Sequence, residues 1–262
     1  MKETESESKP KSCQSLEVVQ VSTLKAEAVY HLQLNSPRWS WRPGQFAMIR
    51  PEGWGVDPFT ARPFSIADQD HFCLDFFWQV VGKGTLKLTE LVQGQRVIVW
   101  GPLGNGFAYD PDTPTLLLAG GMGIIPFYGL INNHPRPENL ELIFGHRQGL
   151  QAYPYNYLAQ KVLAWDVLDR NEMDLQNLER ALRVKIQGYS KDGQILACGP
   201  YPFLRKIQNL SKEFGAKTQI SVETYMACGI GACLGCVVVK SDGDYTQACL
   251  HGPVFNSEDI IL

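Results

Sequence analysis

The stretch that decides the organisation of this chain is Tyr225-Met226-Ala227-Cys228-Gly229-Ile230-Gly231-Ala232-Cys233-Leu234-Gly235-Cys236. A further cysteine, Cys249, follows it after twelve intervening residues. Four of the seven cysteines lie here, with the spacing C-x4-C-x2-C-x12-C. This spacing is typical of plant-type [2Fe-2S] sites, in which four thiolates hold two irons. The glycines between them can adopt a positive φ and let backbone N–H groups point at the sulfides. The pattern predicts that Cys228, Cys233, Cys236 and Cys249 ligate a [2Fe-2S] cluster.

Three other uses of clustered cysteines compete with this interpretation. A structural zinc site normally shows two short CxxC pairs, whereas here the first pair is split by four residues and Cys249 stands alone. Disulfides are disfavoured because nothing marks the chain as secreted. Cysteines that serve only as small apolar residues are not expected to gather in a glycine-rich loop. The cluster is the favoured interpretation, and zinc stays open as an alternative.

Composition limits the class of protein. The chain has 262 residues, 44% of them hydrophobic and 19% charged, as in an ordinary globular protein with room for more than one domain. A net charge of −3 gives no broad basic surface for nucleic acid, and no run of about 18 apolar residues predicts a membrane span. Residues 1–13 lack the apolar core of a signal peptide and are expected to form a disordered tail. Seven cysteines without a secretion signal predict reduced thiols in a cytoplasmic protein.

Residues 14–110 consist of short β-type segments separated by turn residues such as Asn35-Ser36-Pro37 and Arg42-Pro43-Gly44. Many short strands at this spacing favour a small antiparallel β-barrel, interrupted by one helical stretch at Thr85–Leu91. The predicted strands are Leu16–Val21, Ala28–Leu34, Gln45–Arg50, Phe64–Ala67, Phe72–Val81 and Arg96–Trp100.

Two segments of this barrel could bind a planar ligand that carries a diphosphate. In Arg62-Pro63-Phe64-Ser65, side chains alternate along a strand, so Arg62 and Phe64 share a face. The guanidinium fork suits a pyrophosphate, and Ser65 or its backbone could reach a ring nitrogen. In Gly82-Lys83-Gly84-Thr85, small residues at a helix start leave N–H groups free for a phosphate. The plainer alternatives, an exposed arginine beside a core strand and a turn capped by Thr85, stay open.

Residues 111–218 show strands that alternate with helices. Thr115–Ala119 is a continuous apolar run that leads into Gly120-Gly121-Met122-Gly123-Ile124-Ile125-Pro126 and an apolar helix, the arrangement in which nucleotide phosphates meet a helix N-terminus. Cys198-Gly199-Pro200 follows a later strand, so both segments lie at one edge of a parallel sheet and could flank a nicotinamide. Cys198 could equally be a packed small residue. The predicted strands are Thr115–Ala119, Leu140–Phe144 and Gln194–Ala197, and the predicted helices are Phe127–Ile131, Asp174–Val184 and Phe203–Phe214.

Taken in chain order, Arg-Pro-Phe-Ser, Gly-Gly-Met-Gly-Ile-Ile-Pro and Cys-Gly-Pro resemble the ferredoxin–NADP reductase superfamily. The cysteine loop, followed by Cys249-Leu250-His251-Gly252-Pro253-Val254-Phe255, narrows the resemblance to the electron-transfer subunits of bacterial NAD-linked dihydroorotate dehydrogenases. The resemblance covers residues 15–255. It implies an FAD-binding β-barrel at residues 14–110, an NAD-binding α/β domain at 111–218 and a [2Fe-2S] module at 219–262.

The resemblance also implies roles for individual residues. Ser65 and Cys198 are the candidate catalytic residues. The residues expected to hold FAD are Arg62, Pro63, Phe64, Ser65, Gly82, Gly84 and Thr85. Those expected to hold the pyridine nucleotide are Gly120, Gly121, Gly123, Cys198, Gly199 and Pro200.

Two positions depart from the superfamily pattern. Phe64 stands where tyrosine is frequent, which removes a hydroxyl but leaves a ring that can stack on a flavin. Residues 150–194 lack the glycine-rich acidic stretch of many relatives, so the choice between NAD and NADP stays open. Arg147 is compatible with a 2′-phosphate, although arginine at such a position also occurs in relatives that use NAD.

The resemblance implies a route of electrons from dihydroorotate through FMN on a partner subunit, then [2Fe-2S] and FAD, to NAD⁺ in pyrimidine biosynthesis. A nicotinamide exchanges two electrons and a cluster one, so a flavin is expected between them. The chain has no room for a dihydroorotate-oxidising domain, so an FMN-containing catalytic subunit is the implied partner, two of each in a heterotetramer, docking at the cluster module. Two alternatives stay open. One is an FAD/[2Fe-2S] diaphorase subunit of a ferredoxin-dependent transhydrogenase, sulfide dehydrogenase or hydrogenase, and the other is a zinc-binding regulatory module without redox chemistry.

Overall fold

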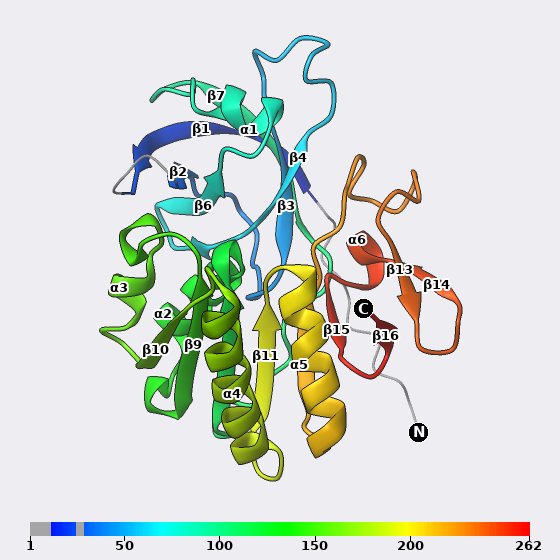
Figure 1. Ribbon diagram of the computed structural model, residues 1–262. Coiled ribbons are helices and arrows are strands. Elements are labelled where there is room, and N and C mark those ends of the chain that lie inside the picture. The colour runs from blue at the N-terminus through cyan, green and yellow to red at the C-terminus, as the bar shows by residue number, and fades with distance from the viewer. Residues whose placement is uncertain (1–11, 25–28) are drawn as a thin grey trace.

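The computed structural model describes residues 12–24 and 29–262. Figure 1 shows a curled antiparallel sheet at the top, a parallel sheet with helices below it, and the C-terminal segment beside both. Of the tail predicted at residues 1–13, Ser12 and Cys13 belong to the first strand, and the rest lies outside the described residues. No helix in the described part of the chain is long and apolar enough to cross a membrane.

The N-terminal sheet contains seven strands in the order β4-β3-β7-β1-β2-β6-β5, and all its neighbours pair antiparallel. It curls around a core that includes Leu34, Ile49 and Phe76, and so forms a half-barrel. This confirms the predicted antiparallel architecture, although the barrel is open between β4 and β5. The strands are β1 (Ser12–Thr23), β2 (Val29–Asn35), β3 (Phe46–Pro51), β4 (Arg62–Ser65), β5 (Asp68–Gln69), β6 (Cys73–Gln79) and β7 (Arg96–Leu103).

Within residues 12–24 and 29–103, the one helix is α1 (Lys83–Leu88), which begins two residues before the predicted stretch Thr85–Leu91. Gly82 caps it in an extended conformation, and the hydroxyl of Thr85 accepts hydrogen bonds from the backbone N–H groups of Val81 (2.9 Å) and Gly82 (3.1 Å). The turn is therefore closed by Thr85, which explains why the helix starts early.

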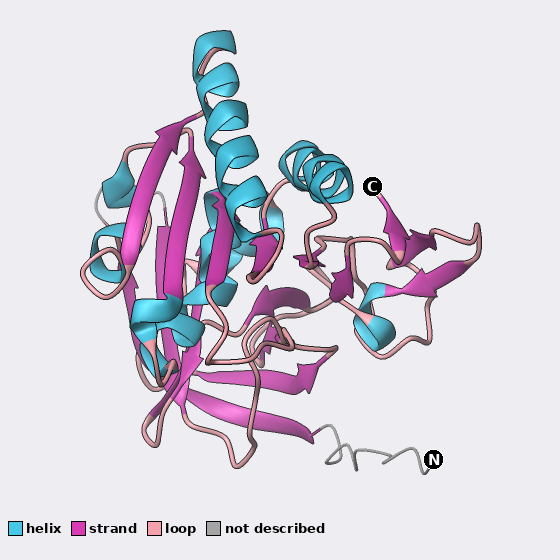
Figure 2. Ribbon diagram, turned by 90° about the horizontal axis from the view of Figure 1, so that it is seen from below, coloured by secondary structure: helices cyan, strands magenta, loops and turns pink. Residues whose placement is uncertain are grey.

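The second sheet has the order β10-β9-β8-β11-β12-β15, and its first five strands run parallel. Alternate residues of β8 face opposite sides: Leu116 and Leu118 pack in the cluster that contains α4 and α5 residues, and Leu117 packs with α2 residues. Figure 2 shows the two long helices on one side of the sheet and short ones on the other. The elements are β8 (Thr115–Gly120), the 3-10 helix η1 (Gly121–Phe127), α2 (Tyr128–Asn133), η2 (Pro137–Asn139), β9 (Leu140–His146), η3 (Leu150–Ala152), α3 (Tyr155–Leu158), β10 (Leu163–Leu168), α4 (Glu172–Tyr189), β11 (Gln194–Cys198), α5 (Tyr201–Phe214) and β12 (Thr218–Ser221).

Two of the parallel strands of this sheet were not expected from the sequence. β10 lies at the edge, and four of its six residues are exposed, so it lacks the continuous apolar run of its neighbours. β12 has only four residues and follows directly on α5 and its left-handed cap Gly215. Both strands extend the sheet whose carboxyl ends form the site described below.

The C-terminal segment contributes a small antiparallel sheet, β14-β13-β16, and also completes the parallel sheet. β15 pairs antiparallel with β12, so the chain returns from the cysteine loop to the sheet it left. The predicted boundary between residues 218 and 219 falls inside β12, and the three-domain division stays a prediction. The elements are β13 (Val237–Lys240), β14 (Tyr245–Gln247), α6 (Ala248–His251), β15 (Val254–Asn256) and β16 (Ile260–Ile261).

Candidate functional site

A cavity of about 520 Å³ lies where the two large sheets and the C-terminal segment meet. This volume is in the range of sites for cofactors and small ligands, roughly 300–1,000 Å³. Nine of the predicted site residues line it: Arg62, Pro63, Phe64, Ser65, Thr85, Gly120, Gly121, Cys198 and Pro200. Four others, Gly82, Gly84, Gly123 and Gly199, lie outside the lining set. Segments that are far apart in sequence thus form one concave site.

The half-barrel wall of the cavity is β4, which carries Arg62, Phe64 and Ser65. The Arg62 guanidinium is held through Nη1, which donates to the carbonyl oxygen (2.7 Å) and the hydroxyl (2.8 Å) of Thr60. A Cβ placed on Gly84 would overlap this guanidinium. The absence of a side chain at Gly84 therefore lets the start of α1 lie against Arg62, and both predicted phosphate segments meet at this end of the cavity.

The hydroxyl of Thr85 also donates to the carbonyl of Gly82 (2.9 Å), in addition to its two acceptor contacts with the turn. Its hydrogen-bonding capacity is therefore used within the protein. A phosphate contact at this segment has to come from backbone N–H groups of the helix start rather than from this hydroxyl.

The opposite wall is formed by the carboxyl ends of β8 and β11. Gly120 and Gly121 line the cavity, and Gly123 packs behind them, because a Cβ there would overlap the backbone of Cys198 and Gly199. The Cys198 thiol is 3% exposed, and burial, reinforced by the charge of Glu223, raises its pKa well above the usual range. Cys198 therefore offers a neutral thiol to the cavity at physiological pH.

Five residues at or after the end of β12 also line the cavity, and sequence reasoning missed them: Ser221, Val222, Glu223, Thr224 and Met226. The hydroxyl of Thr224 is buried and has no hydrogen-bond partner among the described residues. Partial desolvation raises the pKa of the Glu223 carboxyl. The signal that could have found them is the rule that ligands bind at the carboxyl ends of parallel strands, applied to Thr218–Ser221.

The unpaired hydroxyl of Thr224 tests whether the cavity suits a flavin. An unsatisfied buried polar group costs about 1–3 kcal/mol, so a native protein normally supplies it with a partner. The polar edge of an isoalloxazine can accept or donate at such a hydroxyl, while Phe64 and Trp78 supply apolar and aromatic walls. Arg62 and the start of α1 lie together at one end of the cavity and are suited to the diphosphate. The residues that line the cavity therefore fit FAD.

The four cysteines of the loop come together as two pairs. Cys233 lies next to Cys228 and donates its backbone N–H to the Cys228 Sγ (3.4 Å), and Cys236 lies next to Cys249. Cys249 is brought in by α6, and its Sγ accepts the backbone N–H of Gly231 (3.1 Å). Two thiol pairs suit two irons, each of which takes two thiolates.

Backbone N–H groups stabilise thiolate character in this loop. The Sγ of Cys228 is partly buried, which opposes ionisation, but it receives N–H contacts from Ile230 (3.5 Å) and Cys233 (3.4 Å). Together these donors lower its pKa to about 7. Burial, and then the hydrogen bond with Cys236, raises the pKa of Cys249 to about 12. The loop thus has the sulfur donors and backbone N–H groups that an iron–sulfur cluster needs.

The cysteine loop packs directly against the half-barrel. Trp100 of β7 donates its indole N–H to the carbonyl of Cys228 (3.2 Å), and a Cβ on Gly229 would overlap Met48 of β3. Met226 lines the cavity and lies two residues before Cys228. One short segment therefore joins the cavity wall to the first cysteine of the loop.

The sequence is similar to those of known electron transfer subunits over most of its length. Residues 223–261 match the family model of the iron–sulfur cluster binding domain of dihydroorotate dehydrogenase B. The electron transfer subunit of dihydroorotate dehydrogenase B (NAD(+)) from Clostridium acetobutylicum is 32% identical over 247 residues, which cover 90% of this chain and 92% of that protein. The corresponding subunit from Caldanaerobacter subterraneus is 31% identical over 242 residues, covering 90% and 94%.

One solved structure matches this chain over nearly its whole length. The NADH-dependent reduced ferredoxin-NADP oxidoreductase, studied for flavin-based electron bifurcation, superposes with a TM-score of 0.78 at 25% identity, covering 94% of this chain and 89% of that one. A ferredoxin-NADP⁺ reductase from Plasmodium falciparum shares the fold at a TM-score of 0.62 and covers 76% of this chain, at 16% identity. Sequence identity of about one third over nine-tenths of both chains goes beyond likeness of fold. The chain belongs to the family of dihydroorotate dehydrogenase B (NAD(+)) electron transfer subunits.

Proposed function

We propose that this chain accepts electrons at its cysteine loop from a partner that oxidises dihydroorotate, and delivers them at its cavity to NAD⁺. When bound, the [2Fe-2S] cluster would supply single-electron transfer and FAD the exchange between one and two electrons. The main support for the proposal is that the cavity and the cysteine loop are adjacent in the chain. Met226 lines the cavity, and Cys228, two residues later, is a cluster ligand in our assignment.

The half-barrel residues would hold FAD. Arg62, fixed by Thr60 and packed against Gly84, would bind the pyrophosphate together with the N–H groups that start α1. Phe64 and Ser65 would line the flavin ring on one side, and the unpaired hydroxyl of Thr224 would bond its polar edge on the other. Of the predicted set, Gly82 and Thr85 would act by shaping the turn, since the Thr85 hydroxyl is already bonded within it.

The ends of β8 and β11 would receive the pyridine nucleotide. Gly120 and Gly121 would leave room for its phosphates, with Gly123 allowing η1 to pack against β11. The segment Cys198-Gly199-Pro200 would border the nicotinamide, where a neutral thiol excludes water without introducing a charge. Desolvation raises the pKa of the Glu223 carboxyl, so this group would hold a proton more readily than a fully solvated carboxylate.

The face around the cysteine loop would dock the partner. Four large apolar side chains on or beside the loop are exposed: Tyr225, Ile230, Leu234 and Val237. Isolated exposed apolar residues are ordinary, but a group around a redox site favours an interface. The partner would be an FMN-containing catalytic subunit, two of each in the complex. All seven cysteines are free, which suits a cytoplasmic location where thiols stay reduced.

Reconstitution tests this division of labour. The purified chain loaded with FAD and cluster should oxidise NADH with an artificial acceptor, and should oxidise dihydroorotate only after the catalytic subunit has been added. Oxidation of dihydroorotate by the chain alone would contradict the proposal. Loss of NADH oxidation on addition of the partner would also contradict it.

One rival follows from the structural comparison, since the bifurcating ferredoxin-NADP oxidoreductase shares the whole arrangement at a TM-score of 0.78. The rival function is a diaphorase subunit that exchanges electrons with ferredoxin through a different partner. Assay of the loaded chain with reduced ferredoxin and with the dihydroorotate-oxidising subunit, each in the presence of NAD⁺, separates the two. Turnover with ferredoxin and none with the dihydroorotate-oxidising subunit would favour the rival.

A further inference from the structure

The half-barrel and the parallel sheet are joined by a polar contact that the proposed function leaves without a role. Asp68, in β5 of the half-barrel, meets the end of α2, which packs on the parallel sheet. The amide Nδ2 of Asn132 donates to Oδ2 of Asp68 (2.8 Å), and that of Asn133 donates to Oδ1 (2.8 Å). Each oxygen of this carboxylate is therefore bound by an amide from the same helix.

The backbones of the two parts also meet here. The N–H of Gly129 in α2 donates to the carbonyl of Ala67 (2.7 Å), the residue before Asp68. A Cβ on Gly129 would overlap that carbonyl oxygen and the ring of Trp41, so glycine is what lets the helix come this close. Three hydrogen bonds and one close backbone approach thus fix how α2 lies against β5.

The groups of this contact are also oriented from their own side. Oδ1 of Asp68 accepts the backbone N–H of Gln69 (2.9 Å), and Nδ2 of Asn133 donates to the carbonyl of Gly129 (2.9 Å). Oδ1 of Asn132 is buried and has no partner among the described residues. An amide turned the other way would place this oxygen against the carboxylate, so the charge of Asp68 fixes the orientation of Asn132. The geometry depends on a carboxylate at one position and an amide at the other.

The contact lies a short way along the chain from both walls of the cavity. Ser65, which lines the cavity on the half-barrel side, is three residues before Asp68. On the opposite side, Gly121 and Ile125 line the cavity from η1, which continues directly into α2. The contact between β5 and α2 therefore ties together the two segments that carry the opposing walls.

Hydrogen bonds restrain the two walls more precisely than apolar packing does. The rings of Phe77 in β6 and Tyr128 in α2 also meet across the boundary, with 5.3 Å between their centroids. Apolar contact is non-directional, whereas hydrogen bonds to a carboxylate have a preferred length and direction. In the proposed reaction a hydride, one proton with two electrons, passes between a nicotinamide on one wall and a flavin on the other. Reacting atoms must lie about 3–3.5 Å apart, and a misplacement of about 1 Å can cost about a hundredfold in rate.

We propose that Asp68 is a positioning residue, which sets the relative position of the two cavity walls and thereby the rate of hydride exchange between the pyridine nucleotide and FAD. None of Asp68, Asn132 and Asn133 lines the cavity, so the carboxylate acts through the segments that it joins. This inference rests on the proposed function, since it assumes that both groups bind in the cavity.

The test breaks the contact and then restores it in exchanged form. Asp68→Asn places an amide against the amide of Asn132, and Asn132→Asp places a carboxylate against Asp68. The double variant Asp68→Asn/Asn132→Asp again pairs an amide with a carboxylate, and it keeps an oxygen for Asn133. In stopped-flow experiments on the FAD-loaded chain, each single variant should lower the rate of flavin reduction by saturating NADH about tenfold. The double variant should recover to within about threefold of the wild-type rate.

A second readout does not depend on turnover. Tetrahydro-NAD is an analogue of NADH that cannot donate a hydride, so the charge-transfer absorbance of its complex with the FAD-loaded chain reports how the two rings overlap. This absorbance should fall in both single variants and return in the double variant, while the dissociation constants of FAD and ADP-ribose stay within about twofold of wild type. A role in stability alone would lower the unfolding temperature without changing the absorbance of the folded chain.

A milder variant keeps the test decisive if Asp68→Asn does not fold. Asn133→Ala removes one of the two amides at an exposed position, and it should lower the rate of flavin reduction about threefold. An unchanged rate and absorbance in the folded variants, or no recovery in the double variant, would overturn the positioning role alone. A wild-type chain that neither binds tetrahydro-NAD nor is reduced by NADH would overturn the nucleotide site and the proposed function with it.

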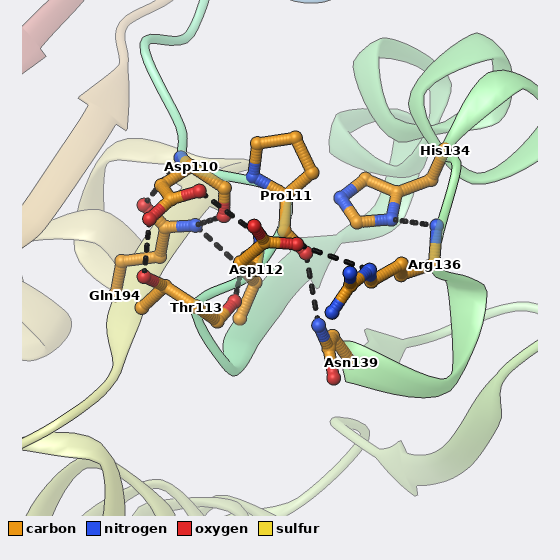
Figure 3. A network of polar contacts seen from close by, with 9 residues as sticks. Asp110, Pro111, Asp112, Thr113, His134, Arg136, Asn139 and Gln194 are labelled. Atoms are coloured by element: carbon orange, nitrogen blue, oxygen red, sulfur yellow. Dashed lines mark hydrogen bonds and ion pairs between the residues drawn. The ribbon is translucent and has the colours of Figure 1, made fainter.

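The matched control is Asp112→Asn. Figure 3 shows Asp112 beside Arg136, an aspartate that also contacts a residue shortly after α2, with 3.0 Å between Oδ1 and Nε. Asp112 precedes β8, so it lies at the edge of the sheet opposite the cavity. Its substitution should therefore leave both the rate and the absorbance at their wild-type values, and an equal loss in this control would contradict the special role of Asp68.

Discussion

The cysteine loop and the cavity are neighbouring sites built in different ways. Three of the four thiols of the loop lie within nine residues, and the fourth follows from the short helix α6. The cavity takes its walls from β4, β6, the ends of β8 and β11, and the segment after β12. The loop is thus formed mainly by residues close in sequence, whereas the cavity is formed by residues far apart in sequence. Substitutions in one site should therefore leave the other largely intact, except for substitutions between β12 and Cys228, in the segment that lines the cavity and leads into the loop.

The largest expected effect is on the loop. Cys249→Ser removes one of the four proposed ligands, so the chain should lose most of its iron and sulfide while keeping FAD at the wild-type ratio. Quantification of iron, sulfide and flavin on anaerobically purified protein measures both. Cys73→Ser, a half-buried cysteine of β6 outside the loop, is the control and should keep both groups. Loss of FAD together with the cluster would show that the two sites do not bind their groups independently.

The second prediction addresses the cavity alone. Gly84→Ala places a Cβ onto the Arg62 guanidinium, so FAD affinity should fall by about tenfold or more while cluster content stays unchanged. Fluorescence titration of the flavin-free chain gives the dissociation constant. Gly188→Ala in α4, where a Cβ meets nothing within 4 Å, is the matched control. Wild-type flavin affinity in Gly84→Ala would show that the α1 turn is not part of the flavin site.

Thr224 lies between β12 and Cys228, in the segment that leads from the cavity to the cysteine loop. Its substitution should raise the stability of the ligand-free chain and lower its affinity for FAD. Thr224→Val keeps the shape and removes an unpaired buried hydroxyl, so the ligand-free chain should become more stable by about 1 kcal/mol. FAD affinity should fall by about three- to tenfold, because the bond that the hydroxyl makes to the flavin is lost. Thermal unfolding with and without FAD measures both effects. A loss of stability in the ligand-free chain would show that the hydroxyl already has a partner.

The smallest effect concerns pH. Burial raises the folded-state pKa of Cys198 above its value in the unfolded chain, so unfolding releases a proton once the pH exceeds about 9. This thiol therefore contributes stability below that pH and loses it as the pH rises, by about 1 kcal/mol between pH 9 and pH 10. Cys198→Ala should show a correspondingly shallower decline in chemical denaturation. Identical profiles would mean that the thiol ionises as freely in the folded chain as in the unfolded one.

The difference between the two sites also explains what sequence reasoning could predict. The cysteine spacing is a local pattern, and the structure brings the four predicted thiols together as two pairs. The antiparallel and parallel sheets were also predictable, because alternating turns and the apolar run at Thr115–Ala119 are local signals. Both sheets are observed, with the barrel open on one side.

What could not be predicted depends on contacts distant in sequence. β12 lacks a strong pattern, so Thr224, which follows it, was missed. The sequence allowed Thr85 either to help bind a phosphate or to cap a turn. The structure shows that its hydroxyl closes the turn. The contact of Asp68 with Asn132 and Asn133 joins two parts of the molecule, which no single stretch of sequence reveals.

The central claim is that one chain couples a two-electron carrier in the cavity to single-electron transfer at the cysteine loop. Anaerobic titration of the purified chain with NADH, followed by visible absorbance and electron paramagnetic resonance, tests it most directly. The account predicts two irons and two sulfides per FAD, bleaching of the flavin, and the signal of a reduced [2Fe-2S] cluster in the same titration. A flavin that bleaches while the cluster stays oxidised, or a colourless chain that contains zinc, would contradict it.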